Sequence, residues 1–431
     1  MFDPGIANRR LRIAAFIGLL VQLFVPFAAL HAQFTYVTND DAITITGYAG
    51  PSGAVTVPDT IYGFPVTSLG TLSFGFAGVT QVSISTNVVS IGASAFSGCY
   101  QLGEVAWGDS VTNIGDSAFY NCQKLTNIVI PAGVIHLGQQ AFYNCSRLTN
   151  VLLGTNLDNI DYRTFYRCTN LQNMVIPDSV TNIGQEAFGW CYHMTNAVIG
   201  DGVTQIGTSA FVVCTNLTTV RIGSAVGSIK DGAFSSCKGL ATVTIPDSVT
   251  NIGGSAFYDC TNMTSVTLGN GIAGIGSSAF SGCGLLTNVT IPASVTSLGS
   301  YAFSFCINLS GLYFEGNAPL VGLNVFIGSD NVFVYSIPGA DGWDWMYGDR
   351  FVLPWDPQIQ FGDAGFGVEE GQFGFNISGS AEFLVKVEAC TNLVNPTWTA
   401  VQTSWLTGGF GHFSDAQWTN LPARFYRLRM P

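Results

Sequence analysis

The chain has 431 residues, of which 47% are hydrophobic and only 10% are charged. An ordinary soluble domain carries about 25% charged residues. Disordered chains are rich in charge and poor in aromatic residues, so the aromatic content of 13% excludes disorder. Nucleic-acid binding needs clustered Lys and Arg, and the formal net charge of −12 therefore predicts no nucleic-acid partner.

Residues 1–32 have the composition of a secretory signal peptide. Arg9, Arg10 and Arg12 precede an apolar run over 13–30, and the segment ends in alanine, a small residue suited to cleavage. The alternative is an uncleaved membrane anchor, because the run is just long enough to span a bilayer. Cleavage would leave 12 basic and 26 acidic residues, a net charge of −14, with no second membrane span. We expect an exported protein that is secreted (extracellular or periplasmic) or held at the cell surface.

Cysteines recur with a period of 23 residues over most of the chain, and only Cys390 lies outside the series. A phenylalanine three residues before each cysteine and a Leu or Met three residues after it keep the same period. A fixed period without insertions predicts a solenoid, in which each repeat forms one coil stacked on its neighbours. The ten periodic cysteines are Cys99, Cys122, Cys145, Cys168, Cys191, Cys214, Cys237, Cys260, Cys283 and Cys306.

One repeat reads CTNLQNMVIPDSVTNIGQEAF over residues 168–188. This unit resembles the BspA-like, or treponemal-type, leucine-rich repeat of bacterial surface proteins, and the resemblance extends over about residues 66–338. It implies a leucine-rich repeat solenoid of 23-residue coils, each built from a β-strand plus short turn or helical segments. It also implies an interaction scaffold, which fixes the fold but leaves the partner open.

The apolar positions of one repeat fit such a coil. Ile128 and Ile130 share one face at a period of two, as a strand requires. We expect Val134 and Leu137 to return to the core and Phe142 to fill it from the opposite wall.

We expect the periodic cysteines to be buried thiols that act as small apolar fillers. Stacked neighbours would lie ~4.8 Å apart with parallel side chains, whereas a disulfide brings Cβ atoms to ~3.8 Å. A metal or redox ladder is the alternative, but neither a C-x-x-C pair nor a histidine ladder accompanies the thiols. The sequence therefore predicts no metal site and no cofactor.

Catalytic residues are not predicted either. His136 and His193 occupy variable slots of separate repeats, and His412 lies near Asp415 in a way that favours a surface pair. Cys191 lies two residues before His193, as a nucleophile and its base could, but it is one of ten equivalent cysteines. A structural role for Cys191 is therefore favoured, and we expect no enzyme activity.

One stretch departs from the repeat, with Asp161 in place of the usual Gly and Thr164 in place of the usual Ala. Three of the array's seven basic residues cluster around it, and a tyrosine holds the same slot in three successive coils. Tyr, Trp and Arg are favoured at binding hot spots, so we expect a binding surface here. The alternative is a drifted repeat whose tyrosines cover the core edge. The candidate residues are Tyr120, Tyr143, Tyr166, Arg147, Arg163, Arg167 and Trp190.

The outward strand position between two inward residues varies from coil to coil. It is apolar in the first half of the array and mostly threonine in the second. An apolar row could form a dry groove for a partner or be covered by the protein's own loops. The position reads Ala106, Val129, Leu152, Val175, Val198, Arg221, Thr244, Thr267, Thr290 and Tyr313.

The two ends of the array differ from its centre. Residues 33–65 are predicted to form an N-terminal β cap, and 66–338 the solenoid with ten cysteine-phased repeats plus degenerate ends. Alternating runs and turn residues over 339–431 predict a β-sandwich-like C-terminal module that holds six of the eight tryptophans. These tryptophans fit a core better than a sugar-stacking platform.

The sequence as a whole predicts an exported, non-enzymatic binding or adhesion scaffold. Its leucine-rich repeat surface would face a protein or glycan partner at a cell surface. The alternative is a carbohydrate-binding protein that acts through the Trp-rich C-terminal module. The oligomeric state stays open.

Overall fold

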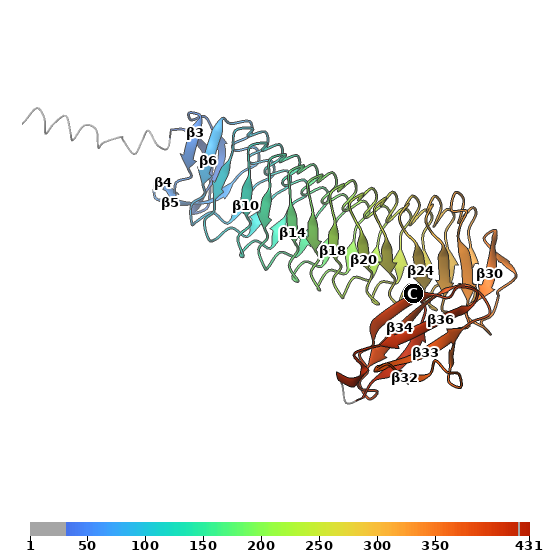
Figure 1. Cartoon of the computed structure of the whole chain (residues 1–431). Helices are drawn as coiled ribbons and strands as arrows, with labels where there is room; N and C mark the ends of the chain where they lie inside the picture. The colour runs from blue at the N-terminus through green and yellow to red at the C-terminus, as the bar shows by residue number, and fades with distance from the viewer. Residues whose placement is uncertain (1–31, 421–422) are drawn as a thin grey trace, which may run out of the picture.

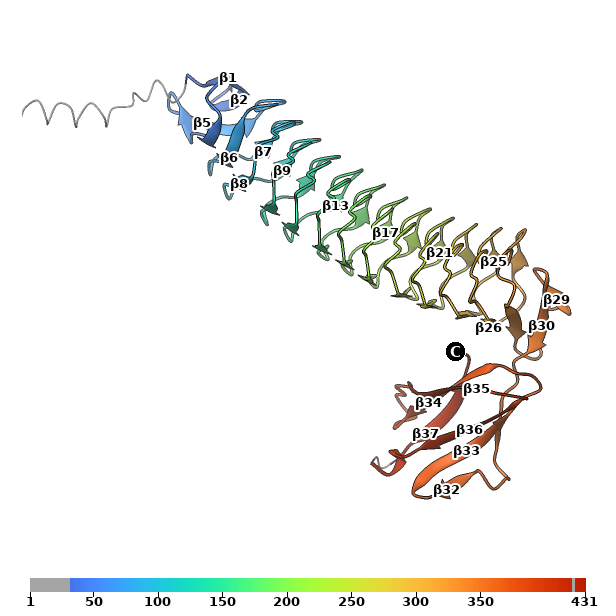
Figure 2. The ribbon, with the colours of Figure 1, turned by 45° about the horizontal axis from the view of Figure 1, so that its top comes forward.

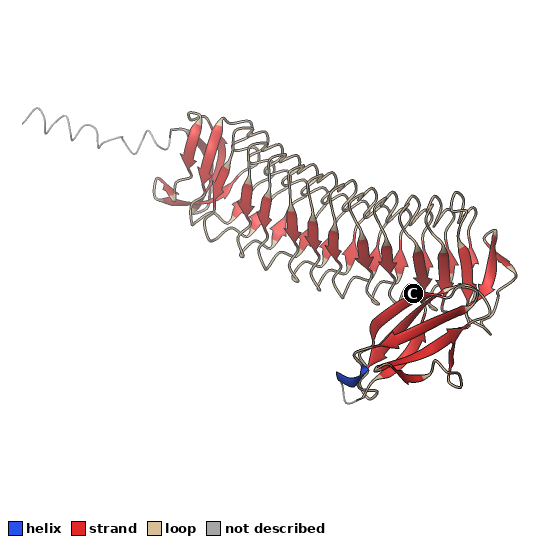
Figure 3. Cartoon of the chain, in the orientation of Figure 1, coloured by secondary structure: helices blue, strands red, loops and turns tan. Residues whose placement is uncertain are grey.

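The computed structural model describes residues 32–420 and 423–431, so the predicted signal peptide lies, but for its last residue, outside the described part. Figures 1 and 2 show an elongated solenoid with a strand-rich module folded to one side of its C-terminal end. Within the described residues, Trp418–Asn420 form the one short 3-10 helix (Figure 3). The residues described include no helix long and apolar enough to cross a membrane.

Each coil contributes one longer strand to a parallel array that we call the long-strand ladder. Paired residues within the central coils differ by 23 positions, as Asn127 and Asn150 do, so equivalent residues stack. Backbone pairing is interrupted between β8 and β10, β18 and β20, and β22 and β24. The strands are β3 (Gly53–Thr56), β6 (Val79–Ser83), β8 (Glu104–Ala106), β10 (Asn127–Val129), β12 (Asn150–Leu152), β14 (Asn173–Val175), β16 (Asn196–Val198), β18 (Thr219–Arg221), β20 (Thr242–Thr244), β22 (Ser265–Thr267), β24 (Asn288–Ile291), β26 (Gly311–Phe314), β28 (Phe333–Ser336) and β30 (Arg350–Pro354).

A second, short-strand ladder follows the turn after most of the longer strands, and its backbone pairing is interrupted between β11 and β13. It begins with an antiparallel hairpin, β1 (Phe34–Asn39) and β2 (Ala42–Tyr48), and β4 (Thr60–Ile61) pairs with its third strand, β5 (Phe64–Leu69). The remaining strands are β7 (Ser90–Ile91), β9 (Asn113–Ile114), β11 (His136–Leu137), β13 (Asn159–Ile160), β15 (Asn182–Ile183), β17 (Gln205–Ile206), β19 (Ser228–Ile229), β21 (Asn251–Ile252), β23 (Gly274–Ile275), β25 (Ser297–Leu298) and β27 (Leu320–Val321).

The core is one continuous column of apolar side chains. The repeat phenylalanines from Phe96 to Phe303 stack on their neighbours with ring centroids 5.0–5.5 Å apart, close to the spacing of the coils. At the N-terminal end the column continues through Phe74, and the hairpin residues Phe34 and Tyr48 cover it. The predicted inward positions, Phe142 among them, are buried, which confirms the expected arrangement of the repeat.

The ten periodic cysteines and Cys390 are buried, and none of them forms a disulfide, which confirms the expectation of free thiols. Each periodic thiol donates to the carbonyl oxygen of the phenylalanine in the preceding coil. The Sγ–O distance is 3.2 Å for Cys145 with Phe119, and the ten distances span 3.0–3.4 Å. Ser329 occupies the same slot past the last cysteine and makes the equivalent bond to Phe303 at 2.7 Å. The column therefore links successive coils as well as filling the core.

The sequence predicts short turn or helical segments between the strands of each coil. The segment before each cysteine is a turn and not a helix. Two residues per turn take left-handed backbone angles, for example Ser117 (φ 54°) and Asn121 (φ 59°). Left-handed residues end a right-handed helix, because helical hydrogen bonding requires an unbroken run of negative φ. Adjacent turns instead hydrogen-bond to one another, as Phe119 N does to Ala141 O at 2.7 Å.

The C-terminal module consists of two antiparallel sheets around their own core. One sheet contains β31, β33, β32 and β36, and the other contains β35, β34 and β37. Phe375, Ile377, Phe383 and Phe413 are among the residues buried between them. The strands are β31 (Gln358–Gln360), β32 (Gly367–Glu369), β33 (Gln372–Ser378), β34 (Leu384–Cys390), β35 (Thr399–Trp405), β36 (Phe410–Asp415) and β37 (Phe425–Arg429).

The long-strand ladder extends past the boundary that the sequence predicts at residue 338. Strand β30 pairs in parallel with β28. It also pairs in antiparallel fashion with β29 (Met346–Tyr347), and the two strands form a final hairpin. This part of the chain lacks the cysteine and phenylalanine that mark each repeat, so the sequence period could not predict that β30 belongs to the ladder. The module's own sheets begin only at β31.

Two tyrosines on the outward face of the ladder fasten the module to it. Tyr313 of β26 and Tyr335 of β28 stack with centroids 4.6 Å apart and are fully buried in the module's core. The Tyr313 hydroxyl accepts from Leu384 N at 3.0 Å, and the Tyr335 hydroxyl donates to Glu382 O at 2.8 Å. The module is thereby fixed against the last coils.

Candidate functional site

The seven residues singled out by sequence, Tyr120, Tyr143, Tyr166, Arg147, Arg163, Arg167 and Trp190, are called the aromatic–arginine surface. Its three tyrosines stack face to face, as the shared slot predicts, with centroid distances of 4.7 and 5.3 Å. Tyr120 and Tyr143 are half-buried, whereas Tyr166 is only 9% exposed. Burial, and then the nearby Glu186, raise the pKa of Tyr166.

Two arginines cover the third tyrosine. The Arg163 guanidinium lies 4.9 Å from the ring centre of Tyr166 and pairs with Glu186 at 2.8 Å. Arg167 lies between Tyr166 and Trp190, 5.8 and 5.3 Å from their ring centres. Glu186 thus neutralises Arg163, while the exposed Arg167 is held by aromatic rings alone.

Arg147 is exposed, and within the described residues its side chain has no ion pair and no contact with an aromatic ring. Among the residues that the structure describes, no acidic group lies within ion-pair distance of Arg147 or Arg167. The surface therefore presents two cations that the chain itself does not neutralise.

Local geometry explains how the departures from the repeat are accommodated. The buried Thr164 hydroxyl donates to Asp161 O at 2.9 Å, so the extra polar group is satisfied within its own turn. Arg163, Arg167 and Trp190 occupy the left-handed turn positions, with φ of 53°, 59° and 64°. A left-handed conformation costs a residue with a Cβ roughly 1–2 kcal/mol, so the turn holds these large side chains at some expense.

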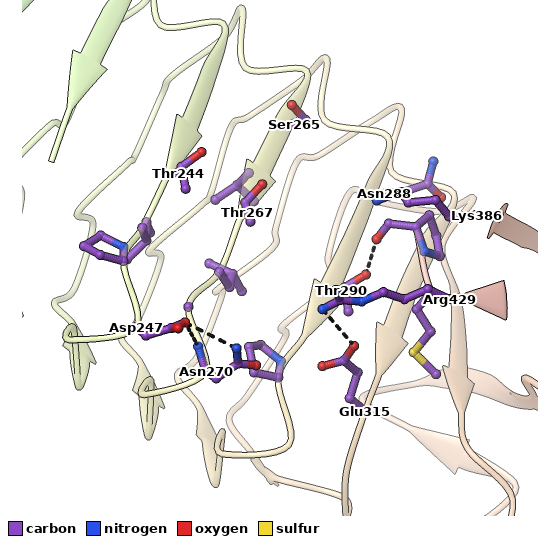
Figure 4. A pocket seen from close by; sticks show the side chains of 18 of the residues that line it. Thr244, Asp247, Ser265, Thr267, Asn270, Asn288, Thr290, Glu315, Lys386 and Arg429 are labelled. Carbon is purple, nitrogen blue, oxygen red and sulfur yellow. Dashed lines mark hydrogen bonds and ion pairs between the residues drawn. The ribbon is translucent and has the colours of Figure 1, made fainter. Parts of the chain in front are cut away.

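A pocket of about 670 Å³ lies where the module meets the long-strand ladder (Figure 4). Its floor comes from the outward positions of β20, β22 and β24, among them Thr244, Thr267 and Thr290. Its wall comes from β34 and β37, which supply Lys386 and Arg429. Sequence reasoning found the threonine row of the floor but not the wall, because nothing in the pattern brings β34 and β37 to this face.

Ion pairs order the wall of this pocket. The Glu388 carboxylate accepts from Arg427 Nη2 at 2.6 Å and Nε at 2.8 Å. Arg429 lies 3.9 Å from both Glu388 and Glu315 and extends toward Glu315 beside Thr290 (Figure 4). The charges of Arg429 and Glu388 are therefore matched within the chain, whereas Lys386 has no ion pair among the described residues.

The apolar row of the outward strand position is open in the first half of the array. Val129 is 54% exposed, Leu152 63% and Val175 59%. The alternative that the protein's own loops cover this row is wrong. In the last coils the same position holds Tyr313, which the C-terminal module buries.

The pairing of Cys191 with His193 as nucleophile and base does not occur. The buried Cys191 thiol donates to Phe165 O at 3.4 Å, and burial raises the pKa of this thiol. His193 is exposed, and its Nδ1 lies 2.8 Å from Thr169 O. A protonated, buried thiol is a poor nucleophile.

Four of the six tryptophans of the C-terminal part lie in different surroundings. Trp343 packs against the solenoid core, and Trp355 against the core of the module. Trp398 lies beneath the Arg427 guanidinium at 4.4 Å, and Trp345 is exposed beside Phe351. A joint sugar-stacking platform is therefore absent from these four.

The family model for the BspA type leucine rich repeat region matches residues 67–195 and 181–310, in six copies. A leucine-rich repeat protein from Bacteroides ovatus is 24% identical, with 75% of this chain and 98% of that chain covered and a TM-score of 0.46. A leucine rich cell surface protein from Faecalibacterium prausnitzii is 25% identical, with 72% and 94% covered and a TM-score of 0.43. The T. pallidum leucine rich repeat protein is 28% identical, with 48% and 88% covered and a TM-score of 0.38. No curated protein matches the chain.

Proposed function

Because the chain belongs to the family of BspA-type leucine-rich repeat proteins, we propose that it is an exported, non-enzymatic binding or adhesion protein. It presents the surface of its solenoid to a protein partner at a cell surface. Residues 1–32 act as a cleaved signal peptide, and the mature protein is secreted or held on the cell. Its function involves no nucleic acid, metal or cofactor.

One observation carries this proposal: the aromatic–arginine surface combines stacked tyrosines with two arginines that no described acidic group neutralises, and one of these, Arg167, lies against the aromatic rings. Stacked rings lose little freedom when a partner covers them, since their conformation is already set. Arg167 is likewise held in place by Tyr166 and Trp190 before any partner arrives. An acidic, aromatic-lined patch on a protein would complement this surface, because its carboxylates would pair with Arg147 and Arg167.

A charge-reversal pair tests the proposal. Arg147→Glu/Arg167→Glu should weaken capture of a surface partner by at least about 30-fold, since hot-spot residues contribute roughly 2 kcal/mol or more. The matched control is Lys230→Glu/Lys238→Glu, which changes the net charge of the same array by the same amount in later coils. Chemical cross-linking to intact cells, followed by affinity measurement with the purified partner, gives the readout. Equal losses in both variants would show that only net charge matters.

A further inference from the structure

A second pocket, of about 460 Å³, lies on the outer face of the module sheet that contains β31, β33 and β36. Strand register places Gln360, Asn376 and His412 side by side in one row across these three strands. Ser378 and Phe410 pair in the next row. Successive side chains of a strand alternate between faces, and the neighbouring Phe375, Ile377 and Phe413 are buried, so both rows face outward.

A chain of hydrogen bonds orients the polar row. Asn376 Nδ2 donates to Asp363 Oδ2 at 2.8 Å, and Asn376 Oδ1 lies 2.8 Å from His412 Nδ1. Because the amide oxygen can only accept, His412 Nδ1 donates to it, and this bond fixes the orientation of the imidazole ring. Asp363 Oδ1 accepts from Gly365 N at 3.1 Å, which holds the carboxylate in place. The row thus presents fixed donors and acceptors before a ligand binds.

An aromatic ring stands beside this row. Phe410 is 70% exposed, and it begins the edge strand β36, where it pairs with Ser378 at the end of β33. The pocket volume falls within the range of roughly 300–1,000 Å³ typical of small-molecule sites, which combine apolar surface with a few oriented polar groups. Asp363 brings the one formal charge to the lining, and it already accepts two hydrogen bonds.

These groups select a neutral ligand that is apolar on one side and rich in hydroxyls on the other. A pyranose ring has this character, because its C–H groups can lie on an aromatic face while its hydroxyls both donate and accept. An anionic ligand would meet the Asp363 carboxylate, and the described lining holds no Lys or Arg to offset it. We propose that this pocket binds one neutral hexose unit of a glycan. The C-terminal module would then hold a carbohydrate site that is separate from the aromatic–arginine surface.

The test uses residues 33–431 and a panel of neutral gluco-, galacto- and manno-configured trisaccharides, with affinity measured by calorimetry. At least one sugar should bind, and Phe410→Ala should weaken that binding about tenfold or more. Phe361→Ala is the matched control, since Phe361 is equally exposed on the same module but lies outside the pocket. His412→Ala, which leaves the aromatic ring in place, should weaken binding as well. Thermal unfolding of each variant separates loss of the site from loss of the fold.

Three results would overturn the proposal. They are no binding by any member of the panel, full binding by the Phe410→Ala/His412→Ala double variant, and an equal loss with Phe361→Ala. Sugar binding should also be the same at roughly 0.05 and 0.5 M salt, because a neutral ligand is not screened. The Arg147→Glu/Arg167→Glu variant should keep full sugar affinity, so failure of the protein-binding proposal and failure of this one are told apart.

Discussion

The phenylalanine column allows the cost of a single core substitution to be worked out. Phe188 is fully buried, and its ring stacks on Phe165 and Phe211 with centroids 5.5 and 5.0 Å away. Phe188→Ala removes the buried ring and leaves a cavity, a change that typically costs about 3–5 kcal/mol. Each lost aromatic pair accounts for about 0.5–1.5 kcal/mol of such a loss. Because a coil contacts only its neighbours, the cost falls on the two interfaces around one coil.

Urea unfolding of residues 33–431, followed by circular dichroism, measures this loss. Long repeat arrays can depart from two-state unfolding, so hydrogen exchange of the coils around Phe188 should be followed as well. The matched control is Phe305→Ala, because Phe305 lies in the same array but is 57% exposed in a turn. Its stability should change by no more than about 0.5 kcal/mol. An unchanged midpoint for Phe188→Ala, or equal losses in the two variants, would refute the placement of this column in the core.

Three further predictions concern the thiols, the module and the N-terminus. Burial raises the pKa of Cys145 and Cys260 from an ordinary value near 9 to about 12. Their stabilising contribution is therefore complete below about pH 9 and is lost as the pH rises toward 12. The loss is ~1 kcal/mol per thiol between pH 9 and 10. Urea midpoints measured across this range test the prediction, and a midpoint that does not change with pH contradicts it. Tyr313→Phe leaves Leu384 N without its partner and should cost about 1–3 kcal/mol, with Tyr120→Phe as a neutral control in unfolding experiments. N-terminal sequencing of the exported protein should begin at Gln33, and an intact Met1 would instead support the anchor.

Periodicity explains why so much of the solenoid was predictable. When one slot is apolar in every coil, the stacked coils bury it together, so Phe142 and Leu137 could be placed in the core without a template. The same logic placed Tyr120 on Tyr143. It could not show that Tyr166 is buried, since that depends on how Arg163 and Arg167 fold over the ring.

The C-terminal part was predicted only in outline, for a physical reason. Its strands pair in antiparallel sheets whose register depends on turns and on contacts between distant segments, and no repeat reports on these. Thr290 of solenoid strand β24, for instance, hydrogen-bonds to the backbone oxygen of Pro431, 141 residues further along the chain. The wall of the interface pocket and the polar row around Asn376 arise from such pairings. Composition therefore suggested tryptophans as the candidate sugar-binding residues of the module, whereas the pocket on its sheet is lined by amides, an imidazole and one phenylalanine.

A uniform coil leaves only a few positions free to differ, and the chain uses these for its contacts. The outward strand position is apolar and open at Leu152, threonine along the interface pocket, and tyrosine at Tyr313, where it fastens the module. Changing this position costs the core nothing, because its side chain points away from it. The left-handed turn position also varies from coil to coil, and at Arg167 it places an exposed cation on the surface. With only 10% charged residues and a screening length of about 8 Å in physiological salt, an unpaired arginine acts on its immediate surroundings alone. The low charge of the array therefore makes each exposed cation a local determinant of what can bind beside it.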